Sequence, residues 1–333
     1  MGKFLEREKL SQIYFKEQSE NFSEAARVDG FYRGELRPFC LPRECARENL
    51  FAEIRDGAID YFEGQRIKWH DGKSGMPSNH LCSSQVQCVN FLYPFADKPQ
   101  ALLRLLRSIF PDIESVEPME TEGRFVSFEW IGLRNYLKEK IRPGGLRTRG
   151  ANFTSADAAV MVTLSDGSRQ IILVEWKYTE SYGSTWLGIA KSGTSRMGIY
   201  RWLYGKAGCP LDKSRVPEYR DLFYEPFYQL MRQQLLAHEM EEARELGVDL
   251  VTVLHVAPAV NGDFLRVTSP GLRHLGGSSL EVWKELVKQP GRFISVSTEA
   301  LFGEFPVDAH PELTSWSQYI YQRHPWVRRR GVE

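Results

Sequence analysis

The sequence has no excess of charge of either sign, since its 43 lysines and arginines equal its 43 aspartates and glutamates. Binding to nucleic acid through net charge is therefore excluded, and any such binding must depend on local basic clusters. Two clusters are candidates for contact with phosphates, although each is also explained as a solvated loop or tail. They are Lys138, Lys140, Arg142, Arg147 and Arg149, and, beside Trp326, Arg323, Arg328, Arg329 and Arg330.

Long apolar segments are also missing. No stretch of about 18 apolar residues exists, so we expect no segment to span a membrane. The N-terminus has neither an apolar run nor a myristoylation pattern, because Glu6 occupies the position that needs Ser or Thr. Internal repeats and low-complexity tracts are absent as well. These features predict a cytoplasmic protein that does not associate with membranes.

Cysteine is scarce and odd in number, with five residues in the chain. An odd count without a secretory signal favours a reducing compartment over a disulfide framework. One group of cysteines and histidines could form a zinc site, but its spacing fits no common template, so core packing is the better interpretation. That group is Cys40, Cys45, His70, His80 and Cys82. No histidine pairs convincingly with a Ser or Cys, so a hydrolase triad has little support.

What the sequence does contain is a pair of apolar segments, 158–164 and 170–174, separated by Ser165-Asp166-Gly167. Segments that are apolar on both faces are typical of strands inside a helix-covered sheet. A three-residue loop ending in Gly forms a hairpin in which Asp157 lies opposite Glu175, on the same face. A two-residue loop would shift the register by one and send the two carboxylates to opposite faces.

The two strands carry charges where they should be buried. Asp157 is a lone carboxylate on the first strand, and the second ends in Glu175-Trp176-Lys177. Such charges are costly unless something compensates them, and two opposed carboxylates repel each other. Mg²⁺ would reverse that repulsion, with the Trp176 carbonyl as a third ligand. Lys177, on the same face, could orient or deprotonate a water. The alternative is a Glu175–Lys177 salt bridge on a strand that emerges into solvent.

Asp157 followed by Glu175-x-Lys177 resembles the bipartite motif of the PD-(D/E)XK nuclease superfamily, although Ala156 stands where the motif has Pro. The wider strings resemble a bacterial group of restriction endonucleases, over about residues 81–245. The matching strings are Ser83-Ser84-Gln85, Asn90-Phe91, Phe128-Glu129-Trp130-Ile131-Gly132, Arg149-Gly150-Ala151-Asn152, Thr154-Ser155-Ala156-Asp157 and Glu175-Trp176-Lys177-Tyr178.

This resemblance implies a restriction-endonuclease-like α/β fold, with an α-β-β-β-α-β core whose mixed sheet is flanked by helices. It also implies DNA cleavage that depends on Mg²⁺, or on Mn²⁺. Members often add a carboxylate from a preceding element, which here points to Glu129 and, less strongly, to Glu139. In several relatives a Gln on the helix after the catalytic hairpin approaches the site. Gln229 and Gln233 are the candidates, and a polar solvated face is the alternative.

The remaining chain supplies flanking elements. We expect an N-terminal arm over residues 1–76, packed on a nuclease-like domain over residues 77–333. Within that domain the patterns predict helices, strands and a long insertion after the catalytic hairpin, over residues 179–222. In the insertion Lys191, Arg196 and Arg201 alternate with aromatic residues, as in surfaces that contact nucleic acid; an aromatic mini-core is the alternative. The predicted helices are 79–91, 99–110, 226–246 and 280–287, and the strands outside the hairpin are 125–131, 250–256 and 293–296.

The sequence therefore predicts a Mg²⁺-dependent endonuclease that hydrolyses DNA phosphodiester bonds and could act as a homodimer. Asp157, Glu175 and Lys177 are its principal catalytic residues, with Glu129 and Gln229 as further members. Two alternatives remain open at this point. One is a structure-specific or repair nuclease acting on DNA or RNA, and the other is a nucleic-acid-binding relative without activity.

Overall fold

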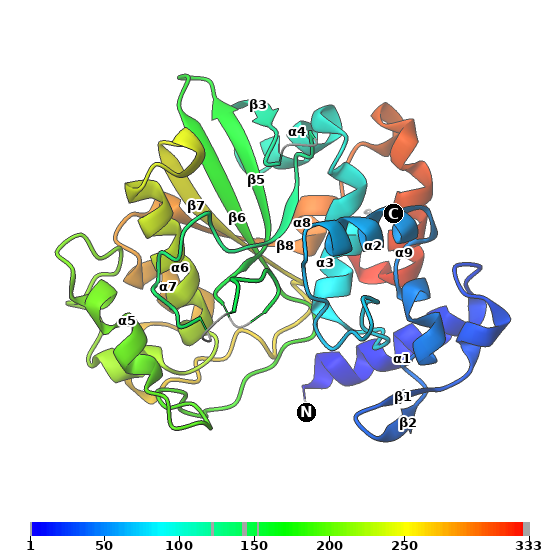
Figure 1. Cartoon of the computed structure of the whole chain (residues 1–333), viewed down its shortest axis with the longest axis horizontal. Helices are drawn as coiled ribbons and strands as arrows, with labels where there is room; N and C mark the ends of the chain where they lie inside the picture. The colour runs from blue at the N-terminus through cyan, green and yellow to red at the C-terminus, as the bar shows by residue number, and fades with distance from the viewer. Residues whose placement is uncertain (1, 121–122, 142–144, 152, 329–333) are drawn as a thin grey trace.

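The computed structural model describes residues 2–120, 123–141, 145–151 and 153–328 (Figure 1). Within these residues the centre is a six-stranded mixed sheet with strand order β3-β5-β6-β7-β8, and β4 pairs with β5. β5 is antiparallel to β3, β4 and β6, whereas β6, β7 and β8 run parallel. The strands are β3 (Ile113–Glu117), β4 (Ser127–Trp130), β5 (Ala156–Leu164), β6 (Arg169–Trp176), β7 (Leu250–Ala257) and β8 (Phe293–Ser297).

The β5–β6 hairpin has the register that its loop predicts. The Leu164 N–H donates to the Ser168 carbonyl at 2.8 Å, and Gly167 has a φ of +82°, as the three-residue loop requires. Ala158 pairs with Val174 and Thr163 with Arg169. The prediction of an odd loop is therefore confirmed, and the shifted register is excluded.

Helices cover both faces of the sheet (Figure 1). Along β5, Val160 and Val162 enter one apolar cluster and Met161 the other, because neighbouring side chains alternate between faces. The first cluster also takes residues from α1 (Lys3–Gln18), α2 (Arg55–Gly64), α3 (Ser84–Leu92), α4 (Pro99–Arg107), α8 (Thr298–Phe302) and α9 (Thr314–Arg323). The second takes residues from α5 (Arg196–Gly205), α6 (Phe227–Glu242) and α7 (Ser279–Leu286). The α/β class with a mixed sheet between helices is confirmed.

Three helix boundaries differ by three or more residues from those the sequence predicts, and one of them is the end of α4, at Arg107 rather than at residue 110. α3 begins at Ser84 rather than at residue 79, because the Ser83 side chain accepts the N–H of Val86 and caps the helix. α6 ends at Glu242 rather than at residue 246, since Arg244 and Leu246 take positive φ values of 47° and 53°. These left-handed residues cannot continue a right-handed helix.

The N-terminal segment is joined to the rest of the molecule through a buried cation. Arg323 of α9 is 2% exposed and donates to Gln12 of α1, to Asn49, to the Leu81 carbonyl and to Tyr319. The prediction that Arg323 contacts phosphates is therefore wrong, because its donors are used inside the protein. The boundary at residue 76 stays a prediction.

A small hairpin lies beside α1 in this N-terminal segment, formed by β1 (Gly30–Tyr32) and β2 (Glu35–Arg37). Across the described part of the chain, no helix is long and apolar enough to cross a membrane.

Candidate active site

Three carboxylates occupy matching positions on three neighbouring strands. The β5–β6 register, continued by one residue from Ala158 and Val174, puts Asp157 opposite Glu175. The β4–β5 register, between the pairs at Phe128 and Trp130, puts Glu129 opposite Asp157. We call Glu129, Asp157 and Glu175 the carboxylate row. The row lies at the strand ends, where β4 stops and β6 leaves the sheet.

Glu175 is 1% exposed and has a partner for each carboxylate oxygen. Lys177, two residues further and on the same face, forms an ion pair with Oε1. Gln233 of α6 donates from Nε2 to Oε2 at 2.7 Å. Trp176, between the two charged residues, points to the other face, where its Nε1 donates to Gln87 of α3 at 2.9 Å. This hydrogen bond to α3 fixes the end of β6 on the face of the sheet opposite Gln233. The segment that carries Glu175 and Lys177 is therefore supported on both faces.

Glu129 is held by a separate set of donors. It is 1% exposed and has a φ of +51°, which is unusual for a residue with a side chain. Its oxygens accept from Gln85 of α3 and from the Ser155 hydroxyl, both at 2.7 Å. His70 Nε2 lies 3.6 Å from Glu129 Oε1. Because Gln233 also donates to the Ser155 carbonyl, Ser155 links Glu129 to the residues that hold Glu175.

Asp157 lies in the middle of the row and remains partly exposed. Its Oδ2 accepts the N–H of Trp176 at 2.7 Å. Burial raises the pKa of Asp157 well above its usual value, and the negative charges of Glu175 and Glu129 raise it further. Lys177 acts in the opposite direction on this pKa. A second cation near Asp157 would therefore relieve a repulsion that the protein alone leaves in place.

The donor chemistry of the row fits a hard divalent cation. Asp157, Glu175 and the Trp176 carbonyl offer oxygen ligands, and Mg²⁺ commonly uses one or two carboxylates together with waters. Among the residues the structure describes, no three His, Cys, Asp or Glu side chains already form a closed metal-binding group. An ion held here would therefore rely on two protein carboxylates, a carbonyl and water. That carbonyl accepts a hydrogen bond from Ser84 at 3.4 Å.

The two glutamine candidates are separated by the structure. Gln233 contacts the row directly, whereas Gln229 lies one helical turn earlier and accepts from the Tyr182 hydroxyl at 3.5 Å. The structure thus places Gln233, rather than Gln229, in contact with Glu175, because the sequence shows which side of α6 is polar but not how far along it Glu175 lies. A role for Gln229 at the site stays a prediction. Glu139 is not in the row either, because it binds Thr154 and Tyr200.

Several residues that sequence reasoning did not single out also contact or extend the row. Gln85 and Ser155 are in the strings that carry the family resemblance, and that was the only available signal for them. His70 entered the sequence analysis only as a member of the possible zinc group, and nothing there indicated its position beside Glu129. His255 of β7 pairs with Glu175 in register. Burial, together with the charge of Lys177, lowers the pKa of His255 to about 3, so this imidazole is neutral.

Three of the nine basic residues proposed for phosphate contact have internal roles, namely Arg147, Arg149 and, as described above, Arg323. The Arg149 guanidinium donates to the Phe128 carbonyl at 2.8 Å and pairs with Glu120 at 2.7 Å. Arg147 donates to the Gly132 carbonyl. These arginines hold the loop before β5 against β4, so that part of the prediction is wrong. Three of the basic residues are exposed: Lys138, which lies over Trp202, Lys140 and Arg328. The remaining three, Arg142, Arg329 and Arg330, lie outside the described residues, as does Asn152 of the family strings.

The insertion after β6 contains an aromatic core. Tyr200 of α5 is 3% exposed and donates to Glu139, and Tyr204 stacks on Tyr219 with ring centroids 4.5 Å apart. Arg196 and Arg201 lie over Tyr228 and Tyr219. The aromatic rings therefore pack against one another, which favours the mini-core interpretation over a nucleic-acid surface.

The cysteines are all free and buried. Cys40 and Cys82 lie near His80, yet burial raises the pKa of the Cys40 thiol to about 12. A protonated thiol is a poor zinc ligand. Core packing is thus the interpretation that the structure favours.

The fold and the carboxylate row define an α/β protein with an acidic site at the strand ends of a mixed sheet. A comparison with protein families matches residues 6–324 to the family described as Restriction Endonuclease associating with ARP. The chain belongs to this family, since the match covers nearly its whole length. No curated protein and no solved structure matches the chain.

Proposed function

We propose that this protein is a metal-dependent endonuclease that hydrolyses DNA phosphodiester bonds, acting as a restriction endonuclease in the cytoplasm. The observation that carries the proposal is the row of Glu129, Asp157 and Glu175 on adjacent strands, with Lys177 paired to its last member. Family membership agrees with this assignment. In this proposal α3, β4, β5, β6, α6 and β7 form the PD-(D/E)XK core.

Asp157, Glu175 and the Trp176 carbonyl would hold Mg²⁺, or Mn²⁺ in its place, and Glu129 would add negative charge on the far side of Asp157. When bound, the ion lowers the pKa of a water and shields the phosphate. Lys177 orients the attacking water, and Glu175 fixes the Lys177 ammonium in turn. Gln233, Gln85 and Ser155 hold the glutamates in place. The water oxygen attacks phosphorus, one P–O bond breaks, and the departing oxygen gains a proton.

The test is whether the purified chain cleaves nucleic acid in the presence of a divalent metal. Supercoiled plasmid, linear duplex, single-stranded DNA and RNA are incubated with Mg²⁺, with Mn²⁺ and with EDTA. We expect plasmid and duplex cleavage that needs the metal. Cleavage of RNA alone would assign the site to the other nuclease class, and tight DNA binding without cleavage under any metal would make the protein a non-catalytic binder.

Lys177→Gln tests the role of the ammonium. We expect the cleavage rate to fall at least about a hundredfold, because removing a group that acts on the water has effects of this size. Asp166→Asn at the exposed tip of the same hairpin is the matched control and should keep full activity. Circular dichroism and thermal unfolding of both variants show whether they fold. Full activity of a folded Lys177→Gln variant would contradict the proposed role.

A further inference from the structure

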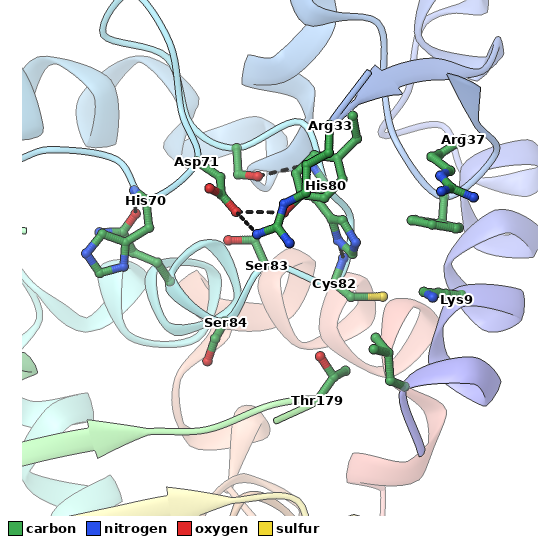
Figure 2. Close-up of a pocket in the computed structure, with 15 residues that line it drawn as sticks. Lys9, Arg33, Arg37, His70, Asp71, His80, Cys82, Ser83, Ser84 and Thr179 are labelled. Carbon is green, nitrogen blue, oxygen red and sulfur yellow. Dashed lines mark hydrogen bonds and ion pairs between the residues drawn. The ribbon is translucent and has the colours of Figure 1, made fainter. Parts of the chain in front are cut away.

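A second concave site lies beside the carboxylate row, with a cavity volume of about 490 Å³ (Figure 2). Its walls come from α1, from the β1–β2 hairpin, from the loop between residues 70 and 80, and from the first turn of α3. None of its cationic residues takes part in the chemistry proposed above. The charged and imidazole side chains that line it are Lys9, Arg33, Arg37, His70, Asp71 and His80.

The β1–β2 hairpin presents an arginine at the rim of this pocket. Its two-residue turn, Arg33 and Gly34, has φ values of +52° and +85°, which match a type I′ turn. Gly34 suits the left-handed region, so the turn is sharp and Arg33 remains at its tip. The Arg33 side chain is 76% exposed, and the Tyr32 hydroxyl ties the hairpin to Asp71 at 2.6 Å.

The charged side chains that line the pocket are mostly cationic, with Lys9, Arg33 and Arg37 against one carboxylate. Asp71 is its one carboxylate among the lining residues, and it already binds the Tyr32 hydroxyl and lies 3.6 Å from Arg33. Arg37 pairs with Glu35, but these two side chains are 43% and 63% exposed, and such surface pairs are weak. Lys9, which is 13% exposed, pairs with Glu6. In a chain without net charge, this local excess of cations favours an anionic ligand.

His80 adds a donor and an aromatic surface. Burial lowers the pKa of His80 to about 4, so the ring is neutral. Its Nδ1 accepts the N–H of Cys82 at 3.0 Å, which leaves the proton on Nε2. The ring centroid of His80 lies 4.8 Å from that of Tyr32 and 5.1 Å from that of Phe39. One wall is therefore aromatic and suited to a planar group.

Four lining residues connect the pocket to the proposed catalytic residues. Gln85 and His70 both reach Glu129, at 2.7 and 3.6 Å. Ser84 donates to the Trp176 carbonyl, the proposed metal ligand, and Thr179 follows Lys177 by two residues. Only one layer of side chains thus separates the pocket from the row. A strand of nucleic acid cleaved at the row would place a neighbouring nucleotide at the mouth of the pocket.

We propose that this pocket is a subsite for one nucleotide of the DNA strand next to the scissile phosphate, with Arg33 and Arg37 on its phosphate and Tyr32 on its sugar or base. The proposal rests on the proposed function, because it assigns a binding position to one nucleotide of the DNA substrate. It gives the N-terminal hairpin a role in substrate binding that is separate from the chemistry at the row.

Binding of a fluorescein-labelled 30-base-pair duplex to the full chain in EDTA tests this subsite without cleavage. Arg33→Ala and Arg37→Ala should each weaken binding about three- to tenfold and reduce the slope of log affinity against log salt by about 1. Tyr32→Ala should weaken binding further than Tyr32→Phe, because only the former removes the ring. Arg104→Ala on α4, another exposed arginine, is the matched control and should bind as wild type does.

The outcomes separate this proposal from the proposed function. Unchanged affinity and salt slope in folded Arg33→Ala and Arg37→Ala would overturn the subsite even if the wild type cleaves DNA. An equal loss in Arg104→Ala would also overturn it, because the effect would then be one of total charge. A free nucleotide has the same chemistry, so AMP binding is measured in parallel. AMP binding that Arg33→Ala abolishes, with duplex binding unchanged, would assign the pocket to a free nucleotide instead.

Discussion

At the scale of single residues, Gln233 is the clearest support of the proposed catalytic pair. It donates to Glu175 and to the Ser155 carbonyl, so it is placed to orient a proposed metal ligand. Groups that orient metal ligands typically change metal affinity or activity 10- to 100-fold when removed. Gln233→Ala should therefore lower the cleavage rate by about tenfold and raise the Mg²⁺ concentration needed for half-maximal rate.

Gln229→Ala is the matched control for that prediction. Gln229 is on the same helix, one turn away, and its contact is with Tyr182 at 3.5 Å. It should leave the Mg²⁺ dependence unchanged. Equal effects of the two substitutions would show that the contact between Gln233 and Glu175 does not orient a metal ligand.

Local chemistry made part of this site predictable from sequence. The Ser165-Asp166-Gly167 loop fixed the hairpin register, and the register put Asp157 opposite Glu175. The position of Gln233 was not fixed in this way, because it depends on how α6 packs across the sheet. The buried Arg323 was unpredictable for the same reason, since its partners Gln12 and Asn49 are distant in sequence.

At the scale of elements, α1 is attached to the strand that carries the proposed catalytic residues. Glu8 of α1 is 1% exposed, and it accepts from the Tyr178 hydroxyl at 2.7 Å and from Trp326 Nε1 at 3.1 Å. Tyr178 directly follows Lys177 in the chain. The N-terminal segment is thus in contact with the chain just beyond the end of β6.

Glu8→Ala should lower the free energy of unfolding by about 1–3 kcal/mol, because it removes the carboxylate that accepts from the buried Tyr178 hydroxyl and from Trp326. Chemical denaturation measures this change. Glu6→Ala is the control on the same helix, since Glu6 is exposed and its pair with Lys9 is at the surface; its effect should stay within about 0.5 kcal/mol. Equal stability of the Glu8→Ala variant and the wild type would refute a structural role for this contact.

At the scale of the whole molecule, stability should depend on pH through a buried histidine. His324 is 1% exposed, and burial, with the charge of Arg323, lowers its pKa well below 6.5. In the unfolded chain the same imidazole takes up a proton below about pH 6.5. The unfolded state then binds more protons, so stability is lost as the pH falls through and below that value, by up to about 1.4 kcal/mol per pH unit.

Urea unfolding from pH 7.5 to pH 4.5 of the wild type and of His324→Asn measures this contribution. The comparison with the variant is needed because buried carboxyl groups with a raised pKa, such as that of Glu8, stabilise the folded state as the pH falls. Their effect on stability is opposite to that of His324. The pH slope should be smaller in His324→Asn, whereas His274→Asn, at an exposed position, should keep the wild-type slope. Identical slopes for all three proteins would contradict a neutral buried His324.

We propose that Asp157 and Glu175 together hold one divalent ion that the protein needs for DNA cleavage. The most direct measurement is Mg²⁺-dependent cleavage of supercoiled plasmid by Asp157→Asn beside the wild type, with Asp166→Asn as the hairpin control. We expect folded Asp157→Asn to lose at least about a hundredfold in cleavage rate, since a bound metal ion supplies several kcal/mol of transition-state stabilisation. Cleavage by Asp157→Asn at the wild-type rate, or wild-type cleavage undiminished by EDTA, would contradict the proposal.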